Sequence, residues 1–290
     1  ACASTGNTSA SVAAYAATAG LPAIVFIPEG KISAAKLGQT IAYGARIVQI
    51  RGNFDAAMAL VQDAARRYGI YLLNSINPFR LEGQKTIVFE LLHQMGWEPP
   101  DWIVLPGGNL GNTSAVGKAL TELHEAGVIG RLPRVAVIQA AGAAPFYEAY
   151  RAGFREYHPV TPETVATAIR IGDPVSYSKA RRTIDLTNGV VAAVSDEAIM
   201  EAKARIDRAG IGCEPASAAT LAGLRQLVSD GVIPVGASVA GILTGHLMKD
   251  TDAVMDYHLG PDAANHPLAN PPQVIDPTPA ALEEILGDVL

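Results

Sequence analysis

Residues Leu105–Ser114 read Leu-Pro-Gly-Gly-Asn-Leu-Gly-Asn-Thr-Ser, and they connect an apolar run, Trp102–Leu105, to a helical pattern, Thr113–Ala126. A strand that turns through glycines into a helix presents unpaired backbone N–H groups and the positive end of a helix dipole, which together hold a phosphate. The residues match neither Gly-x-x-x-x-Gly-Lys-Ser/Thr nor Gly-x-Gly-x-x-Gly, so they do not indicate a nucleoside triphosphate or a dinucleotide. Taken alone, the loop is equally compatible with a connection that binds nothing.

Apolar runs and helical patterns alternate on both sides of this loop. We predict strands at 23–27, 47–50, 70–73, 102–105, 134–139, 189–194 and 237–243. We predict helices at 8–19, 33–43, 54–68, 113–126 and 214–229, a helix that runs to Met95, and helix starts at 161–163 and 195–197. Such an alternation indicates parallel sheets with right-handed crossovers, and therefore the α/β class.

The polar, turn-rich segment Asn74–Thr86 interrupts this alternation and reads as a junction between domains. We expect a smaller α/β domain over residues 1–78 and a larger α/β domain over residues 79–260. Each would have three layers with a parallel or mostly parallel sheet. Residues 261–290 would form a tail, in which the proline-rich stretch from Pro261 to Pro279 predicts poor order.

The composition limits the classes of function. The 290 residues are 49% hydrophobic and carry a net charge of −6, which favours a large core and argues against a nucleic-acid or anionic-membrane surface. The two cysteines, Cys2 and Cys213, are too few for a disulfide framework, and no apolar run approaches the roughly eighteen residues of a membrane span. We expect small-molecule chemistry in a reducing cytoplasm.

The sequence lacks the motifs typical of a histidine metal site and of a serine hydrolase. The six histidines include no His-Glu-x-x-His pattern and no pair spaced for a metal ion on one helix, so we expect no metal site. A Gly-x-Ser-x-Gly nucleophile elbow is also absent from the sequence, so hydrolase chemistry is weakly supported.

Polar residues follow several of the predicted strands. Each has an ordinary structural explanation as a turn asparagine, a surface arginine or a strand-end threonine. In parallel α/β sheets, however, ligands bind beyond the carboxyl ends of the strands, and a shared position there predicts a site. These residues are Asn7, Asn77, Arg80, Asn109 and Thr244.

Five ordered motifs resemble those of the threonine synthase family, pyridoxal-phosphate enzymes of the tryptophan-synthase-β-like fold type II. The resemblance covers about Ser4 to Asp250. The motifs are Ser4-Thr5-Gly6-Asn7-Thr8, Asn74-Ser75-x-Asn77-Pro78-x-Arg80-x-Glu82-Gly83-Gln84-Lys85-Thr86, Gly108-Asn109-x-Gly111-Asn112, Cys213-Glu214-Pro215-Ala216-Ser217-Ala218-Ala219 and Leu243-Thr244-Gly245-His246-x-x-Lys249-Asp250.

The resemblance implies roles for individual residues around pyridoxal 5'-phosphate. Asn7 would meet the phenolic oxygen of the cofactor and Thr244 its pyridine nitrogen, while the cofactor phosphate would be held by Gly108, Asn109, Gly111, Asn112 and Thr113. The implied substrate is O-phospho-L-homoserine, with its α-carboxylate on Ser4, Thr5 and Thr8 and its phosphate on Asn74, Ser75 and Arg80. The implied reaction is γ-elimination of phosphate followed by addition of water at Cβ, which gives L-threonine. The resemblance also suggests a homodimer.

The sequence departs from the family pattern at one point. Relatives of this fold type hold the cofactor as an imine to a lysine upstream of the asparagine loop, and here the sequence begins at Ala1 without a methionine. We therefore expect the Schiff-base lysine upstream of Ala1 and not within these residues. Ser178-Lys179 is the nearest imitation, but it reads as a solvated helix face, while Lys85 and Lys249 belong to other motifs.

Other functions stay open at this point. Lyase and sulfhydrylase relatives, such as threonine or serine dehydratase and cysteine synthase, would usually lack the Asn-Pro-x-Arg run followed by Gly-Gln-Lys-Thr. A non-catalytic protein of the same fold that binds a phosphorylated metabolite is an alternative of a different class.

Overall fold

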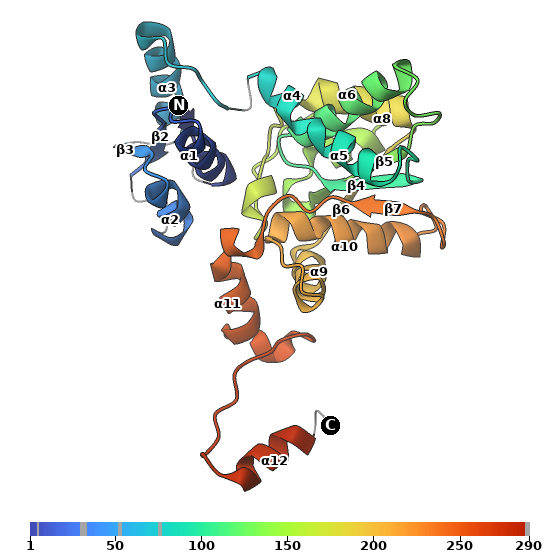
Figure 1. The fold of residues 1–290 in the computed structure, drawn as a ribbon. Coiled ribbons are helices and arrows are strands. Elements are labelled where there is room, and N and C mark those ends of the chain that lie inside the picture. The colour runs from blue at the N-terminus through green and yellow to red at the C-terminus, as the bar shows by residue number, and fades with distance from the viewer. Residues whose placement is uncertain (5, 30–33, 52–53, 75–76, 288–290) are drawn as a thin grey trace.

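The computed structural model describes residues 1–4, 6–29, 34–51, 54–74 and 77–287, and its strands form two separate parallel sheets (Figure 1). The first sheet has the strand order β1-β2-β3, formed by Cys2–Ala3, Ile24–Pro28 and Arg46–Ile50. Three helices accompany it: α1 (Asn7–Thr18), α2 (Ala34–Ala42) and α3 (Phe54–Tyr68).

Different helices cover the two faces of this first sheet. Val25 and Ile27 pack with Leu37 of α2 in one apolar cluster, whereas Phe26 packs with Val61 of α3 in another. Because successive residues of a strand point to opposite faces, the apolar run of β2 supplies both cores. The result is three layers, with the sheet in the middle.

The second sheet is built in the same way on a larger scale. Its strand order is β6-β5-β4-β7, formed by Val190–Val194, Arg134–Ala140, Trp102–Pro106 and Val239–Gly241. Its helices are α4 (Phe79–Gln84), α5 (Thr86–Gln94), α6 (Gly111–Glu125), α7 (Pro145–Arg151), α8 (Tyr177–Thr187), α9 (Asp196–Arg208) and α10 (Pro215–Ser229).

The two faces of β4 lie in different cores. Ile103 and Leu105 pack with Leu120 of α6, whereas Val104 packs with Ala219 of α10. A strand buried on both faces reads as a continuous apolar run, as Trp102–Leu105 does. The predicted α/β class with parallel sheets is confirmed. The domain limits at residues 78 and 260 remain a prediction.

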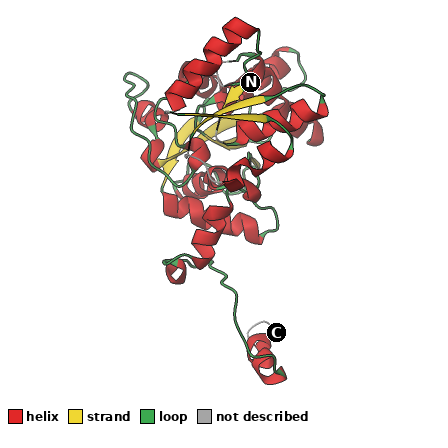
Figure 2. Cartoon of the chain, turned by 90° about the vertical axis from the view of Figure 1, so that its left-hand side faces the viewer, coloured by secondary structure: helices red, strands yellow, loops and turns green. Residues whose placement is uncertain are grey.

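The C-terminal residues contain more regular structure than we expected. Helix α11 (Thr251–Leu259) follows the second sheet, and a final helix, α12 (Pro279–Gly287), lies at the end of an extended segment (Figure 2). The poor order expected for Pro261–Pro279 stays a prediction, and helix α12 was not among the predicted elements. Its Ala-Ala-Leu-Glu-Glu-Ile-Leu sequence consists of good helix formers, which the proline content of the preceding stretch obscured.

Two predicted elements are absent from the described residues. Residues 70–73 form no strand, although Ala1 N donates to Tyr71 O and Leu73 N donates to Ala1 O, both at 2.8 Å. Residues 71 and 73 thus pair with the single residue Ala1, and a pairing of this length is too short to form a strand.

Residues 161–163 begin no helix, because the groups that would start it are bonded elsewhere. Glu163 N donates to Gly142 O at 2.8 Å, and Thr164 Oγ1 donates to Asp196 Oδ1 at 2.5 Å. A proline and an acid in sequence favour a helix start, but these tertiary bonds hold the segment extended until the short turn Thr167–Ile169.

A close contact between α10 and the second sheet yields a first prediction. A Cβ atom added at Gly223 would lie 2.3 Å from Ile138 Cδ1, so Gly223→Ala should lower the free energy of unfolding by about 1–3 kcal/mol despite the better helix propensity of alanine. Gly38 of α2 has nothing within 4 Å of such a Cβ, and Gly38→Ala should raise stability instead, by about 0.5–1 kcal/mol. Thermal unfolding of both variants measures the opposite signs. Equal stability of Gly223→Ala and the parent protein would contradict the packing described.

Candidate active site

The glycine-rich loop after β4 is the first part of the site. Gly107 N donates to Ile138 O at 2.7 Å, which extends the pairing of β4 with β5 by one residue. Leu110 then adopts φ 62°, a conformation that non-glycine residues rarely adopt, and α6 begins at Gly111. The predicted strand, turn and helix are therefore confirmed.

Buried polar atoms without partners gather at the start of α6. Thr113 is fully buried, and its Oγ1 has no hydrogen-bond partner among the described residues. Gln84 Oε1 is likewise without one, and it lies 3.3 Å from where a Cβ of Gly111 would be. A buried hydroxyl without a partner is costly, so the Thr113 hydroxyl suits an oxygen acceptor of a ligand, which the first-turn N–H groups of α6 would also bind. Gln84 Oε1 is itself an acceptor and would need a donor.

Asn109 is held by the segment that precedes α8. Its Oδ1 accepts from Val175 N at 3.4 Å, and its backbone O accepts from Ser176 N at 3.1 Å. The Asn109 amide N–H groups have no acceptor within the described part of the chain, so they remain as donors beside the loop. The donor set at this loop fits the phosphate of pyridoxal 5'-phosphate.

Asn7, at the first position of α1, reaches the second sheet. Its Nδ2 donates to both carboxylate oxygens of Glu214, at 2.8 Å and 3.1 Å, across 207 residues of sequence. Glu214 is buried and precedes the first residue of α10. The structure thus brings the start of α1 to the amino end of α10, while the contact of Asn7 with the cofactor stays a prediction.

Thr244 follows β7 and is held by a serine to which we assigned no role. Ser217 Oγ lies 2.9 Å from Thr244 Oγ1 and accepts from Thr244 N at 3.0 Å and from Gly245 N at 2.8 Å. Ser217 is fully buried in the first turn of α10. The motif Cys213–Ala219 was the sequence signal for both Glu214 and Ser217, but nothing in it distinguished them from core residues.

The described substrate residues predicted from sequence lie after β1, in α1, before α4 and on α4. Ser4 Oγ accepts from Gly6 N at 3.3 Å, Thr8 is in the first turn of α1, and Asn74 is buried. Burial lowers the pKa of Arg80, and it raises the pKa of the Cys2 thiol to about 11, a shift that the nearby Arg80 opposes. The other two predicted residues, Thr5 and Ser75, lie outside the described residues.

Asn77 has a structural task instead of a site role. Its Oδ1 accepts from Phe79 N at 3.0 Å, two residues on, and its Nδ2 donates to Leu72 O at 2.8 Å. Asn77 therefore forms an Asx turn that leads into α4 and fixes the preceding turn. The ordinary reading of this strand-end asparagine is the one that the structure supports.

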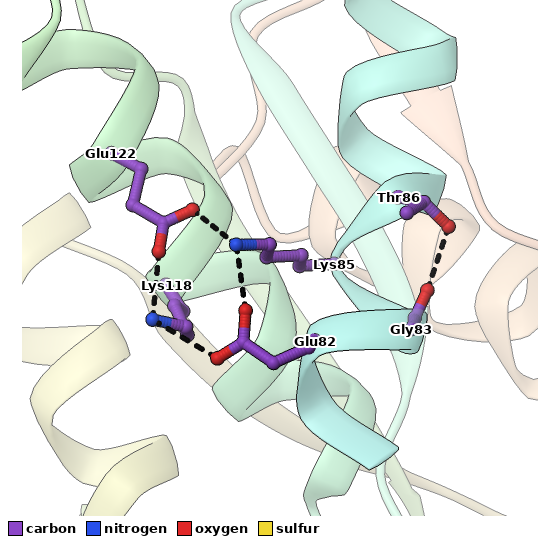
Figure 3. A network of polar contacts seen from close by, with 6 residues as sticks. All are labelled: Glu82, Gly83, Lys85, Thr86, Lys118 and Glu122. Atoms are coloured by element: carbon purple, nitrogen blue, oxygen red, sulfur yellow. Dashed lines mark hydrogen bonds and ion pairs between the residues drawn. The ribbon is translucent and has the colours of Figure 1, made fainter. Parts of the chain in front are cut away.

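The described lysine side chains mostly have other partners. Lys85 lies between Glu82 Oε2 and Glu122 Oε2, each at 2.7 Å, and Lys118 lies 2.7 Å from Glu122 Oε1 and 3.3 Å from Glu82 Oε1 (Figure 3). Figure 3 shows this four-charge cluster joining α4 to α6. Lys249 Nζ donates to Gln39 Oε1 of α2, and Lys179 is exposed on α8.

We predict that the four-charge cluster stabilises the folded protein at neutral pH but not in acid. Hydrogen bonds from Lys118 and Lys85 lower the pKa of Glu122 below its ordinary 4.5, so the cluster contributes fully above about pH 4.5 and is lost as pH falls through the lowered value. Glu122→Gln should therefore lower the thermal midpoint at pH 7, and its difference from the parent protein should shrink below pH 4.5. Glu125→Gln, an exposed change on the same helix, is the control. A difference that stays constant with pH would argue against the assigned role.

Within the described ranges, no three His, Cys, Asp or Glu side chains gather closely enough to hold a metal ion. Across the same residues, no helix combines the length and the apolar character needed to cross a bilayer.

Comparisons with known proteins agree with this geometry. The family model described as pyridoxal-phosphate dependent enzyme matches residues 1–245. The threonine synthase of Methanocaldococcus jannaschii is 50% identical over 256 residues, which are 88% of this chain and 63% of that protein. The threonine synthase of Mycobacterium tuberculosis (strain H37Rv) is 46% identical over 257 residues, 88% of this chain and 69% of that protein.

A solved structure shows the same fold. The crystal structure of threonine synthase from Escherichia coli superposes with a TM-score of 0.68 at 23% identity, covering 100% of this chain and 70% of that one. The chain thus spans less than two thirds of the M. jannaschii relative, at 63%, and somewhat more of the other two.

Proposed function

We propose that this chain, which belongs to the threonine synthase family of pyridoxal-phosphate-dependent enzymes, takes part in converting O-phospho-L-homoserine and water to L-threonine and phosphate. One structural observation carries the proposal. The segment that resembles the family's substrate-phosphate motif abuts the proposed cofactor-phosphate loop, because Gln84 Oε1 lies against Gly111 and α4 is tied to α6. Two anion-binding segments side by side suit a phosphorylated substrate beside a phosphorylated cofactor.

The residues around the loop would hold the cofactor. Its phosphate would lie on Gly108, Asn109, Gly111, Asn112 and Thr113, among which Thr113 offers a hydroxyl and Asn109 its amide N–H groups. When bound, pyridoxal phosphate supplies an electron-accepting ring that stabilises negative charge on the carbon atoms of an amino acid. The protein contributes placement and proton control.

Ser217 sets the direction of the hydrogen bond at Thr244. A serine hydroxyl has one hydrogen and two acceptor lone pairs, and both lone pairs of Ser217 are taken by Thr244 N and Gly245 N. Its hydrogen has two acceptors within reach, Thr244 Oγ1 at 2.9 Å and Gly245 O at 3.4 Å. Donation to the nearer oxygen leaves the Thr244 hydrogen for another acceptor. We infer that this acceptor is the pyridine nitrogen, which then stays largely unprotonated because a hydroxyl is a weak acid.

Arg80 and Asn74 would bind the phosphate that leaves the substrate. A guanidinium offers forked donors to a phosphate dianion, and burial strengthens such charged hydrogen bonds. Burial of Arg80 already lowers its pKa, so it lies in surroundings where an anionic partner is favoured. Ser4 and Thr8, at the start of α1, would hold the α-carboxylate of the substrate near the positive end of that helix.

The proposal extends to the state of the protein in the cell. We propose a homodimer in the cytoplasm, by analogy with the soluble biosynthetic role of the family. Size-exclusion chromatography with light scattering decides the oligomeric state.

A substrate panel tests the proposed function on the complete polypeptide encoded with this chain. O-phospho-L-homoserine, L-threonine and O-acetyl-L-serine are supplied separately, and phosphate, threonine and 2-oxobutanoate are quantified. We expect equal amounts of phosphate and threonine from the first substrate, with kcat/KM at least about 100-fold above either other substrate. A preference for L-threonine with 2-oxobutanoate as the product would favour a dehydratase instead.

A further inference from the structure

The contact between Asn7 and Glu214 links two distant parts of the chain and also determines how the Asn7 amide is oriented. Both Glu214 oxygens accept from the same atom, Asn7 Nδ2, at 2.8 Å and 3.1 Å. A carboxylate only accepts hydrogen bonds, so it selects the amide orientation in which the NH2 group faces it. The opposite orientation would bring the carbonyl oxygen of Asn7 against two other oxygens.

Glu214 is itself held rigidly. Its side chain is buried, and its backbone N donates to Gly245 O at 3.0 Å. A Cβ atom at Gly245 would lie 2.3 Å from Glu214 Oε1, so the carboxylate packs directly on the glycine backbone. The positive end of the α10 dipole adds to the stability of a negative charge at this place.

An amide NH2 group has two hydrogens, and the Glu214 carboxylate needs only one of them. The second hydrogen points away from Glu214 by the geometry of the planar amide. Because Glu214 packs on Gly245, next to Thr244, the oriented amide lies at the same end of the sheet as the proposed cofactor contacts.

We propose that Glu214 is a positioning residue that orients the Asn7 amide, so that an N–H group and not the carbonyl oxygen meets the phenolic oxygen of pyridoxal 5'-phosphate. This inference rests on the cofactor assigned under the proposed function. It assigns Glu214 a task that the sequence motif did not reveal, and it explains why a glycine follows Thr244.

An isosteric variant tests the orientation directly. Glu214→Gln keeps the shape of the side chain, but its own NH2 group can donate to Asn7 Oδ1, so the Asn7 amide is free to turn over. We expect the Kd of pyridoxal 5'-phosphate, measured by absorbance titration, to rise about fivefold to tenfold. The Kd of 3-deoxypyridoxal 5'-phosphate, which lacks the phenolic oxygen, should change less than about twofold.

A double-mutant cycle shows whether Glu214 acts through Asn7. In an Asn7→Ala background, Glu214→Gln should leave the Kd of pyridoxal 5'-phosphate within about twofold, because no amide remains to be oriented. A helix-start role alone would move the Kd equally in both backgrounds and for both ligands, and that result would overturn the proposal. An unchanged Kd for Glu214→Gln in the parent background would overturn it as well.

A variant with the acid and the amide exchanged separates two roles of Glu214, which are orienting the Asn7 amide and linking α1 to α10. Asn7→Asp combined with Glu214→Gln restores a hydrogen bond between α1 and α10, but the carboxylate introduced on α1 offers only oxygens to the ligand. We expect the thermal midpoint of the cofactor-free protein to return to the parent value, while the Kd of pyridoxal 5'-phosphate rises at least about tenfold beyond that of Glu214→Gln. Recovery of the parent Kd by this pair would contradict the proposal. All of these experiments measure binding or stability and none measures turnover. Their results therefore decide the role of Glu214 even if the protein forms no threonine.

Discussion

Replacing Arg80 with alanine should lower kcat/KM for O-phospho-L-homoserine by roughly 100- to 1000-fold and leave the Kd of pyridoxal 5'-phosphate unchanged. Loss of one partner from a buried, charged pair costs about 2–5 kcal/mol, and about 1.4 kcal/mol corresponds to a tenfold change. We assign Arg80 to the substrate phosphate and the start of α6 to the cofactor phosphate, so the loss of Arg80 should spare cofactor binding. Steady-state kinetics and cofactor titration measure the two effects.

Two further variants sharpen this prediction. Arg80→Lys keeps the charge but loses the planar fork, so its kcat/KM should fall between those of the parent protein and Arg80→Ala. Arg66→Ala removes an exposed arginine of α3 whose nearest acid, Asp63, is 3.8 Å away, and it should leave the kinetics unchanged. Equal losses of substrate use and cofactor affinity in Arg80→Ala would show that Arg80 does not face the substrate phosphate.

Placing a carboxylate in the loop after β4 should separate folding from cofactor binding. Asn112 is in the first turn of α6, where a negative charge is favoured by the helix dipole, so Asn112→Asp should stabilise the cofactor-free protein by about 0.3–1 kcal/mol. The same charge repels a phosphate dianion at close range, so the Kd of pyridoxal 5'-phosphate should rise about 100-fold or more. Thermal unfolding and absorbance titration measure these opposite signs.

The neutral change at the same position is the matched control. Asn112→Ala removes the side-chain donor without adding charge, and it should weaken cofactor binding by about tenfold at most. If Asn112→Asp binds pyridoxal 5'-phosphate as tightly as the parent protein, the phosphate does not lie on this helix start.

Local patterns predicted the second sheet and the glycine-rich loop after β4 well. The run Trp102–Leu105, the glycines and the helical pattern after them lie close together in sequence, and each part follows from short-range rules. Helix α3 was predicted with its observed limits, Phe54–Tyr68, because its apolar periodicity is undisturbed. Such elements need little help from distant residues.

Elements that depend on distant partners were predicted poorly. Residues 70–73 have an apolar strand pattern, but they pair only with Ala1, and residues 161–163 have a helix-start pattern that Gly142 and Asp196 override. Propensity describes what a segment prefers alone, and tertiary hydrogen bonds outweigh it here.

The candidate site shows the same limit. Asn7 and Thr244 were identified from strand ends and from family resemblance, but the residues that hold them, Glu214 and Ser217, were not. Glu214 lies 207 residues from Asn7 and Ser217 lies 27 residues from Thr244, so no short-range spacing rule connects either pair. Only the folded structure brings Glu214 to Asn7 and Ser217 to Thr244.

The reaction in water enriched in ¹⁸O tests the central claim most directly, because it reports which bond to oxygen breaks and where water enters. The complete polypeptide that contains this chain is supplied with pyridoxal 5'-phosphate and O-phospho-L-homoserine, and the products are analysed by mass spectrometry. Elimination at the carbon–oxygen bond followed by hydration at Cβ predicts ¹⁸O in the hydroxyl group of L-threonine and none in the released phosphate. Homoserine accompanied by ¹⁸O-labelled phosphate, which is the signature of phosphate-ester hydrolysis, would contradict the proposed function.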